Sequence, residues 1–370
     1  MNDAIVAVST MKADPDQVER FLQRNLGAGV DHVLVFLDDA NPPVRQLLEE
    51  HPHATVVRTG PKYWNGARPP RVSDRLRINM NVANAVLATV PSVGWLVSID
   101  SDEAVCIDRD ALLSSDARAV VLSVLEAVSK RSWPDDEPTL FKSRPTYGEL
   151  AALAAMGIII EPDVAYYFRG HQEGKPAVRP DLRVRVRVHS AHDEAGRGLA
   201  RPARGLHVLH YESHSLDDFI RRWKDYAPSG AHLRTHRDDR KLLGIALHTL
   251  HNHETLNERQ KSRLIKHLFD REVADDVKTL KAMGLAAPAP KREYQPRPLP
   301  PGDVAQIERL LEALLPADKR VFNEGGTTKQ VAAELGEAAD RLAEAGDDSA
   351  AENVRTTLDR FHGREDAPQS

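Results

Sequence analysis

The sequence contains little of what defines several classes of protein. Its one cysteine, Cys106, excludes an intramolecular disulfide and a zinc site built from cysteines. No run of about 18 apolar residues occurs, so we expect no membrane span. The start of the chain lacks a basic segment followed by an apolar one. We therefore expect no signal peptide and a cytoplasmic location.

The chain also lacks an excess of charge of one sign. Its 370 residues include 50 Lys and Arg and 55 Asp and Glu, a formal net charge of −5. This balance argues against nucleic acid or an anionic membrane as the main partner. The 41% of hydrophobic and 28% of charged residues are typical of a globular protein, and the length is enough for more than one domain.

Several standard nucleotide and hydrolase motifs are missing. The glycines of residues 170–176 are too close together for a phosphate-binding P-loop, and Pro176 stands where that loop needs a hydroxyl residue. The Gly-Ala-Gly at residues 27–29 lacks the third glycine of the dinucleotide fingerprint. Neither a Gly-x-Ser-x-Gly elbow nor a His-Glu-x-x-His helix is present.

Strand and helix signals alternate over the first 130 residues, which predicts an α/β domain with a mostly parallel sheet. Asp14 with Gln17 has the spacing of a capping box, so a helix is expected to begin at Pro15. The other helices are expected around residues 44–48 and 71–89. Strands are expected at residues 4–9, 32–37, 54–58 and 95–99.

Beyond residue 135 the pattern predicts short strands, then helices. The strands are expected at residues 139–142, 157–160, 164–168, 182–189 and 206–211, and the helices at 216–283, 304–315 and 328–361. Six prolines in residues 286–302 indicate a linker. We divide the chain into a domain at 1–230, a helical extension at 231–285, this linker, a C-terminal helical segment at 303–362 and a disordered tail at 363–370.

The strongest functional signal is Asp100-Ser101-Asp102, directly after the apolar strand 95–99. In open α/β sheets ligands gather at the carboxyl ends of strands, and a carboxylate there is costly unless it is paired or bound to metal. One aspartate can bind Mg²⁺ or Mn²⁺ while the other meets a ribose hydroxyl. The alternative is a solvated turn or a helix cap.

Two further strand ends carry polar side chains. His210 precedes Tyr211 at the end of a strand and could give a nitrogen ligand to the same cation, although a lone histidine there is more often structural. Asp38 and Asp39 end the second strand, where an acid can hold a base or a ribose hydroxyl. An ordinary helix-capping turn is the alternative for this pair.

Basic residues form a third group. Lys175 and Arg179 could reach phosphate oxygens, unless they are solvated residues of a hairpin. The alternation of residues 183–189 places three arginines and a histidine on one strand face, which we interpret as solvent-exposed. Arg75 could point from its helix toward a nucleotide, and a surface arginine is the alternative.

In this order the segments resemble those of bacterial family 2-like glycosyltransferases of the GT-A fold. The resemblance covers roughly residues 4–226 and rests on MKADPDQVERFLQRNLGAGVDHVLVFLDD, YWNGARPPRVSDRLRINMNVAN, WLVSIDSDEAV, GKPAVRP with His189, and LHYESHSLDDFIRRW. It implies a Rossmann-like nucleotide-binding sheet. It also implies transfer of a hexose-type sugar, with inversion, from a nucleotide diphosphate sugar to a hydroxyl-bearing acceptor, with Mn²⁺ or Mg²⁺.

The resemblance assigns roles residue by residue. Metal binding falls to Asp100, Asp102 and His210. Nucleotide-sugar binding falls to Thr10, Lys12, Asp38, Arg75, Asp100, Ser101, Lys175 and Arg179. Inversion needs a carboxylate that takes the acceptor's proton. The candidates for this base are Glu173, Asp193 and Glu212, and Asp193 is slightly favoured because it lies in a polar loop. Tyr63 and Trp64 are either an acceptor platform or core aromatics.

The chain departs from the family pattern in two places. Ala13-Asp14 replaces the usual acid after Lys12 and an asparagine, and residues 38–42 read Asp-Asp-Ala-Asn-Pro instead of Asp-x-x-Ser-x-Asp. Because of these departures, the resemblance does not identify the base of the nucleotide. Two other functions remain: a nucleotidyltransferase, and a non-catalytic domain that binds a sugar or scaffolds a partner. The C-terminal helices are interpreted as an oligomerising or acceptor-recruiting module.

Overall fold

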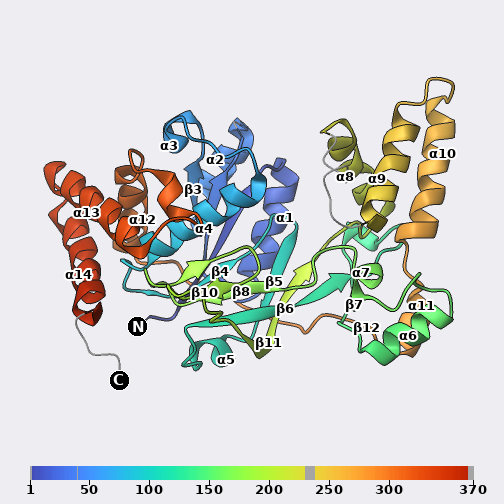
Figure 1. Cartoon of the computed structure of the whole chain (residues 1–370), viewed down its shortest axis with the longest axis horizontal. Coiled ribbons are helices and arrows are strands. Elements are labelled where there is room, and N and C mark those ends of the chain that lie inside the picture. Colours follow the sequence, from blue (N-terminus) through green and yellow to red (C-terminus); the bar gives the residue numbers. More distant parts are fainter. Residues whose placement is uncertain (1, 40, 230–237, 366–370) are drawn as a thin grey trace. The chain divides into compact units, whose positions relative to one another are not determined.

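The computed structural model describes residues 2–39, 41–229 and 238–365 (Figure 1). The chain forms two compact units, each built from separate stretches of sequence. Unit 1 takes the described residues within 1–123, 174–208 and 291–370, and unit 2 those within 124–173 and 209–290. The domain boundaries stay predictions. The boundary at residue 230 and the tail residues 366–370 lie outside the described residues.

Unit 1 is built on a mixed sheet with a parallel centre. The strands β1 (Ala4–Met11), β2 (His32–Leu37), β3 (Ala54–Arg58) and β4 (Val93–Ser98) are parallel, in the order β4-β1-β2-β3. β8 (Lys175–Val178) pairs antiparallel with β4, and the first half of β6 (Ala119–Ala127) pairs antiparallel with β8. The Rossmann-like α/β class is confirmed, and all four predicted strands of the first 100 residues are present. The finer GT-A assignment stays a prediction.

Local signals set the helices of unit 1. The capping box at α1 (Pro15–Leu26) is formed as expected: the Gln17 N–H donates to Asp14 Oδ1 at 2.8 Å. α2 (Pro42–Glu50) and α4 (Val72–Leu87) lie where the sequence predicts them. α4 packs against β1 and β4, and most of its residues from Ile78 onward are buried. α3 (Pro61–Trp64) and α5 (Arg109–Leu113) are short.

The C-terminal helices share the core of unit 1. The elements α12 (Pro301–Ala313), η4 (Lys319–Phe322), α13 (Thr328–Glu344) and α14 (Asp348–Glu365) bury their apolar faces in one cluster with β1 and α4. Ile307, Phe322 and Leu335 are fully buried in it. Each such side chain contributes roughly 1.5–3 kcal/mol. These helices therefore stabilise unit 1, and their interpretation as an oligomerising module stays a prediction.

The proline-rich stretch is attached along its length. It begins with β12 (Ala286–Ala287), which pairs with β7 (Phe141–Lys142) in unit 2. In unit 1 the Tyr294 N–H donates to the Gly27 carbonyl at 3.1 Å, and the Tyr294 hydroxyl donates to Asp31. The Arg297 N–H also donates to Asp31, at 3.2 Å. Prolines here limit the backbone conformation, while tertiary hydrogen bonds hold the segment in place.

Unit 2 is mainly helical around a small antiparallel ribbon of β12, β7 and the end of β6. Its helices are α6 (Tyr147–Ala155), α7 (Val164–Tyr167), α8 (Leu216–Ser229), α9 (Asp238–His251), α10 (Glu258–Leu268) and α11 (Val277–Ala282). Two apolar clusters form its core. One surrounds Trp133, Leu153 and Phe168, and the other surrounds Phe219 and Phe269.

Several expectations about short strands are wrong. Within the expected strand 164–168, Val164–Tyr167 form helix α7, because Asp163 caps it by accepting the Ala165 N–H at 2.7 Å. Residues 157–160 form turns and bends, and within 182–189 only β9 (Arg185–Val186) is a strand, paired with β10 (Ala191–His192). β11 (Arg201–His210) confirms the last expected strand and begins earlier. The sequence analysis missed β5 (Glu103–Ile107) and β6.

The buried His32 in β2 makes the stability of unit 1 depend on pH. Its Nε2 lies 2.9 Å from Thr55 Oγ1. Burial, with added repulsion from His53 and His51, lowers the pKa of His32 to about 4. The unfolded chain takes up this proton near pH 6.5, so stability is present above that pH and falls as the pH drops toward 4. We expect a loss of roughly 3 kcal/mol.

Urea denaturation at about pH 7 and about pH 4.5 measures this loss. His32→Gln keeps a polar group for Thr55 but does not titrate, so its stability should fall less than that of the wild type over the same interval. Parallel losses in the two proteins would contradict the assignment to His32.

Candidate functional site

The Asp-x-Asp motif lies in the turn between β4 and β5, at the carboxyl edge of the parallel strands of unit 1. The Asp100 N–H donates to Glu103 Oε2 at 2.7 Å, and the Glu103 N–H returns a bond to the Asp100 carbonyl at 3.1 Å. Glu103 is buried, while Ser101 and Asp102 are partly exposed. Glu103 thus closes the turn, and Ser101 and Asp102 lie at its surface.

Lys175 holds this turn from β8. Its Nζ lies 2.5 Å from Asp100 Oδ2 and 3.4 Å from Glu103 Oε2, and its side chain is fully buried. Burial acts to lower the pKa of Lys175, but the carboxylates of Glu103 and Asp100 outweigh it and raise that pKa above its ordinary value. The lysine therefore stays charged between two carboxylates.

Arg179 does not join Lys175, although the two were expected to act together. β8 runs antiparallel to β4 with Val178 opposite Leu96, so Arg179 lies toward the other end of β4 from Asp100. Lys175 and Arg179 are four positions apart on an extended strand, which separates their backbones by about 13 Å. The Arg179 guanidinium stacks 4.6 Å from the centre of the Trp95 ring and donates to the Ser115 carbonyl at 2.5 Å.

Asp38 and Arg75, both expected to bind the nucleotide sugar, contact each other. Arg75 Nε donates to Asp38 Oδ2 at 2.9 Å, and Arg68 Nη2 lies 3.1 Å from the same carboxylate. Thr10 Oγ1 accepts a hydrogen bond from Asn79 at 2.9 Å, and Lys12 is exposed. The ends of β1 and β2 are thus polar, with the charge of Asp38 already balanced.

Tyr63 and Trp64 lie in the core of unit 1. Each is 1% exposed, and the rings pack edge to face with centroids 4.8 Å apart. The Tyr63 hydroxyl donates to Asn79 Oδ1 at 2.8 Å. An acceptor platform needs an exposed ring face, so the core alternative describes their place in this structure.

A small hollow opens beside Asp100. Thr10 and Ser98, from the ends of β1 and β4, line it together with Asp100. The rest of its lining is Leu76, Arg77, Met80, Ile99, Arg187 and Val188. The residues around this small hollow are thus both apolar and polar.

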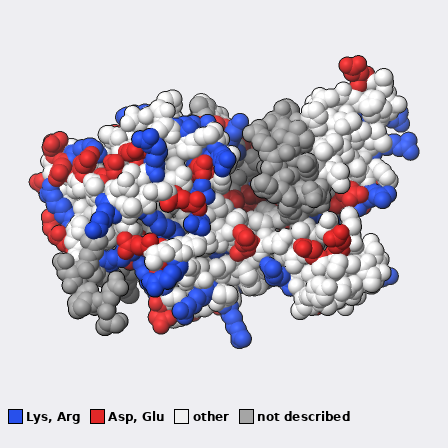
Figure 2. All heavy atoms as spheres, viewed as in Figure 1, with Lys and Arg blue, Asp and Glu red and all other residues white. Residues whose placement is uncertain are grey.

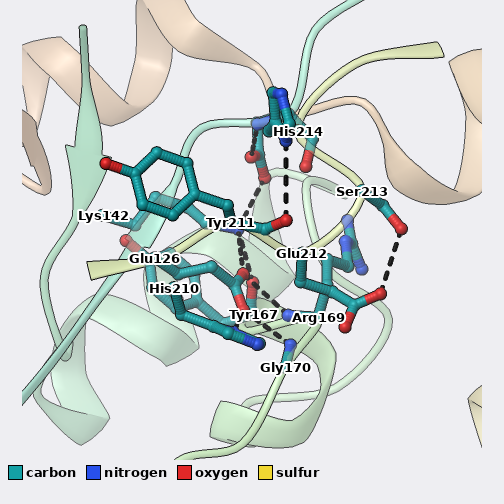
Figure 3. A network of polar contacts seen from close by, with 12 residues as sticks. Glu126, Lys142, Tyr167, Arg169, Gly170, His210, Tyr211, Glu212, Ser213 and His214 are labelled. Carbon is teal, nitrogen blue, oxygen red and sulfur yellow. Dashed lines mark hydrogen bonds and ion pairs between the residues drawn. The ribbon is translucent and has the colours of Figure 1, made fainter. Parts of the chain in front are cut away.

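His210 lies in unit 2, at the end of β11, beside a buried network of charges (Figure 3). Its Nδ1 is 3.6 Å from Glu126 Oε2, and both side chains are buried. Glu126 accepts the N–H groups of Arg169 and Gly170 at 2.7 and 2.6 Å and lies 3.0 Å from Lys142 Nζ. Burial acts to raise the pKa of Glu126, but Lys142 and His210 outweigh it and hold that pKa well below its usual range.

Lys142 completes this network. Its Nζ donates to the Tyr167 carbonyl at 2.9 Å and to Asp275 Oδ1 at 3.1 Å. A Cβ on Gly170 would lie 1.8 Å from His210 Cε1, so only glycine permits this approach. Glu126 and Gly170 thus both lie close to the His210 ring.

The three candidates for the catalytic base lie in different surroundings. Asp193, in unit 1, accepts the Arg197 N–H at 2.8 Å and Arg197 Nε at 2.7 Å. These bonds, the backbone one first, lower the pKa of Asp193. In unit 2 Glu173 is exposed, and Glu212 accepts the Ser213 hydroxyl at 3.1 Å. The assignment of the base stays a prediction.

The metal assignment likewise stays a prediction, with Asp100 and Asp102 in unit 1 and His210 in unit 2.

The sequence analysis missed Glu103, Glu126 and Lys142. A signal existed for the last two: Glu126 stands in the apolar run 119–128 and Lys142 after Leu140-Phe141. A charge inside an apolar strand is costly without a partner, so each predicts an opposite charge nearby.

The surface carries mixed charge. Figure 2 shows Lys and Arg interspersed with Asp and Glu over the described part of the face in view, as the near balance of the composition leads one to expect. Within the described residues no helix has the length and apolarity that crossing a membrane requires.

Comparisons with known proteins include a weak likeness to a solved structure. No family model matches the chain, and no curated protein matches it. Among solved structures, the crystal structure of HddC from Yersinia pseudotuberculosis is similar over 59% of this chain and 96% of that chain, with 10% identity and a TM-score of 0.29. A likeness at this level supports no statement about function.

Proposed function

We propose that the protein is a divalent-metal-dependent glycosyltransferase. It transfers a sugar, with inversion, from a nucleotide diphosphate sugar to a hydroxyl-bearing acceptor. The observation that carries the proposal is the ion pair of the buried Lys175 with the partly exposed Asp100, the first aspartate of the Asp-x-Asp motif, at the carboxyl edge of a Rossmann-like sheet. Ligands of such sheets bind at this edge.

The residues at this edge fit a hard cation. Lys175 contacts Asp100 at Oδ2, and 32% of the Asp100 side chain is exposed. Asp102 is partly exposed on the same turn. Carboxylate oxygens of this kind would hold Mn²⁺ or Mg²⁺, with His210 as the third ligand by resemblance. The cation would stabilise the negative charge that the departing nucleoside diphosphate gains.

The chain's own residues have separate tasks in this proposal. Lys175 fixes the orientation of Asp100 and offsets part of the negative charge of Asp100 and Glu103 at the edge that receives the diphosphate. Thr10 and Ser98 line the neighbouring hollow. One of Glu173, Asp193 and Glu212 takes the acceptor's proton.

Thermal denaturation with UDP, GDP, CDP or dTDP, each with and without Mn²⁺, tests the proposal. A ligand at about 100 times its dissociation constant stabilises the folded state by about 2.7 kcal/mol, so the melting temperature should rise with one nucleotide and only with Mn²⁺. Asp102→Asn should abolish the rise. Asp110→Asn, an exposed aspartate in α5, should keep it. No rise with any nucleotide, or an unchanged rise in Asp102→Asn, would contradict the proposal.

Product analysis separates the remaining functions. Release of a nucleoside diphosphate from a nucleotide sugar is expected of a glycosyltransferase. Formation of pyrophosphate from a nucleoside triphosphate and a sugar phosphate would instead identify a nucleotidyltransferase. Binding without turnover of any donor would indicate the non-catalytic domain.

A further inference from the structure

Two arginines from different parts of unit 1 flank the hollow beside Asp100. Arg77 comes from α4, and Arg187 directly follows β9. Both line the hollow together with Thr10 and Asp100. Neither has a role in the donor site as proposed above.

A carboxylate from the C-terminal segment lies between these arginines. Glu324 Oε1 is 3.3 Å from Arg77 Nη1 and 3.3 Å from Arg187 Nε. Arg77 Nε also donates to Asn323 Oδ1 at 3.2 Å, while its Nη2 bonds to Asp74 on the same helix. Two of the three nitrogens of Arg77 are therefore used by the loop that joins η4 to α13.

The loop is anchored on both sides of Glu324. The Gly326 carbonyl accepts a hydrogen bond from Arg185 at 3.1 Å, and a Cβ at Gly326 would lie 1.8 Å from the Val321 carbonyl oxygen. Thr327 then begins α13 with a capping box. The arginines at positions 183, 185 and 187, interpreted from the sequence as solvent-exposed, thus contact the C-terminal segment. The backbone is held while the Glu324 side chain remains 47% exposed.

The contact of Glu324 is weak enough to be replaced. Ion pairs between exposed side chains contribute little to stability because water and salt screen them, and the Arg187 and Glu324 side chains are each 47% exposed. A diphosphate carries more charge and several oxygens, and the planar guanidinium of arginine binds phosphate through two parallel hydrogen bonds. Such a ligand can therefore displace a single carboxylate.

We propose that Arg77 and Arg187 form a binding site for the phosphate oxygens of a nucleoside diphosphate, and that Glu324 occupies this site until the ligand arrives. The identity of the ligand rests on the proposed function. The C-terminal segment then acts on the donor site as an internal competitor, in addition to stabilising unit 1.

Calorimetric titration of the full chain with inorganic pyrophosphate, in buffer with a chelator, tests the arginine pair apart from the metal. Glu324→Gln should bind pyrophosphate about two- to fivefold more tightly, because the competing charge is gone. Arg187→Gln should bind it about tenfold more weakly. Glu337→Gln, an exposed glutamate of α13, is the matched control and should bind like the wild type.

The outcomes separate this inference from the proposed function. Weaker binding by Glu324→Gln would show that Glu324 organises the arginines, and would overturn the proposal of a competitor. No pyrophosphate binding, or unchanged binding in Arg187→Gln, would overturn the site itself. In that case a Mn²⁺-dependent nucleotide effect lost in Asp102→Asn would leave the proposed function standing. If pyrophosphate binding changes as expected but no nucleotide raises the melting temperature, the site is supported and the glycosyltransferase function is rejected.

Discussion

Glu126→Leu should destabilise unit 2 by about 3–5 kcal/mol, because it breaks a buried ion pair and leaves Lys142 with the carboxylate of Asp275 only. The substitution takes away the carboxylate 3.0 Å from Lys142 Nζ. It also leaves the N–H groups of Arg169 and Gly170 without their acceptor. Urea denaturation measures the loss, and hydrogen exchange at these two amides should become faster.

Two variants control this experiment. Glu126→Gln removes the charge but keeps one oxygen, which can accept from one of the two amides, so its loss should be smaller. Glu161→Gln, an exposed glutamate of unit 2, should change the stability by less than about 0.5 kcal/mol. The low pKa of Glu126 means that its contribution is present at neutral pH and is lost as the pH falls below the unfolded value of about 4.3. Wild-type stability in Glu126→Leu would refute this account of the network.

Lys175→Met should have a comparable effect on unit 1 and should also abolish nucleotide binding. It leaves the carboxylates of Asp100 and Glu103 close together without the cation between them. The expected loss is about 3–5 kcal/mol at neutral pH. Burial already raises the pKa of Asp100, and Lys175 opposes this rise. Without Lys175 that pKa should rise further, so the variant should recover part of its lost stability relative to the wild type as the pH falls.

A second substitution tests whether charge is the cause. Adding Glu103→Gln to Lys175→Met removes one of the two carboxylates and should restore part of the stability. Lys62→Met, at an exposed lysine, should be within about 0.5 kcal/mol of the wild type. A double variant no more stable than Lys175→Met would show that lost packing, rather than unbalanced charge, is responsible.

The sequence by itself determined the elements that depend on neighbouring residues. The capping box of Asp14 and Gln17 is local, and so are the apolar runs of β2 and β3, which the structure has with the expected bounds. The position of Asp100 at the end of β4 follows from the same local reasoning. Hydrogen bonds within one turn and a period of two residues require no knowledge of distant segments.

Tertiary structure alone decided which distant residues meet. The register of β8 on β4 brings Lys175 to Asp100 and takes Arg179 away, although four positions separate these basic residues. Arg185 and Arg187 contact the C-terminal segment, more than 130 residues later in the chain, at Gly326 and Glu324. A charged side chain predicts that a partner is needed, but only the packing of the elements selects which partner it finds.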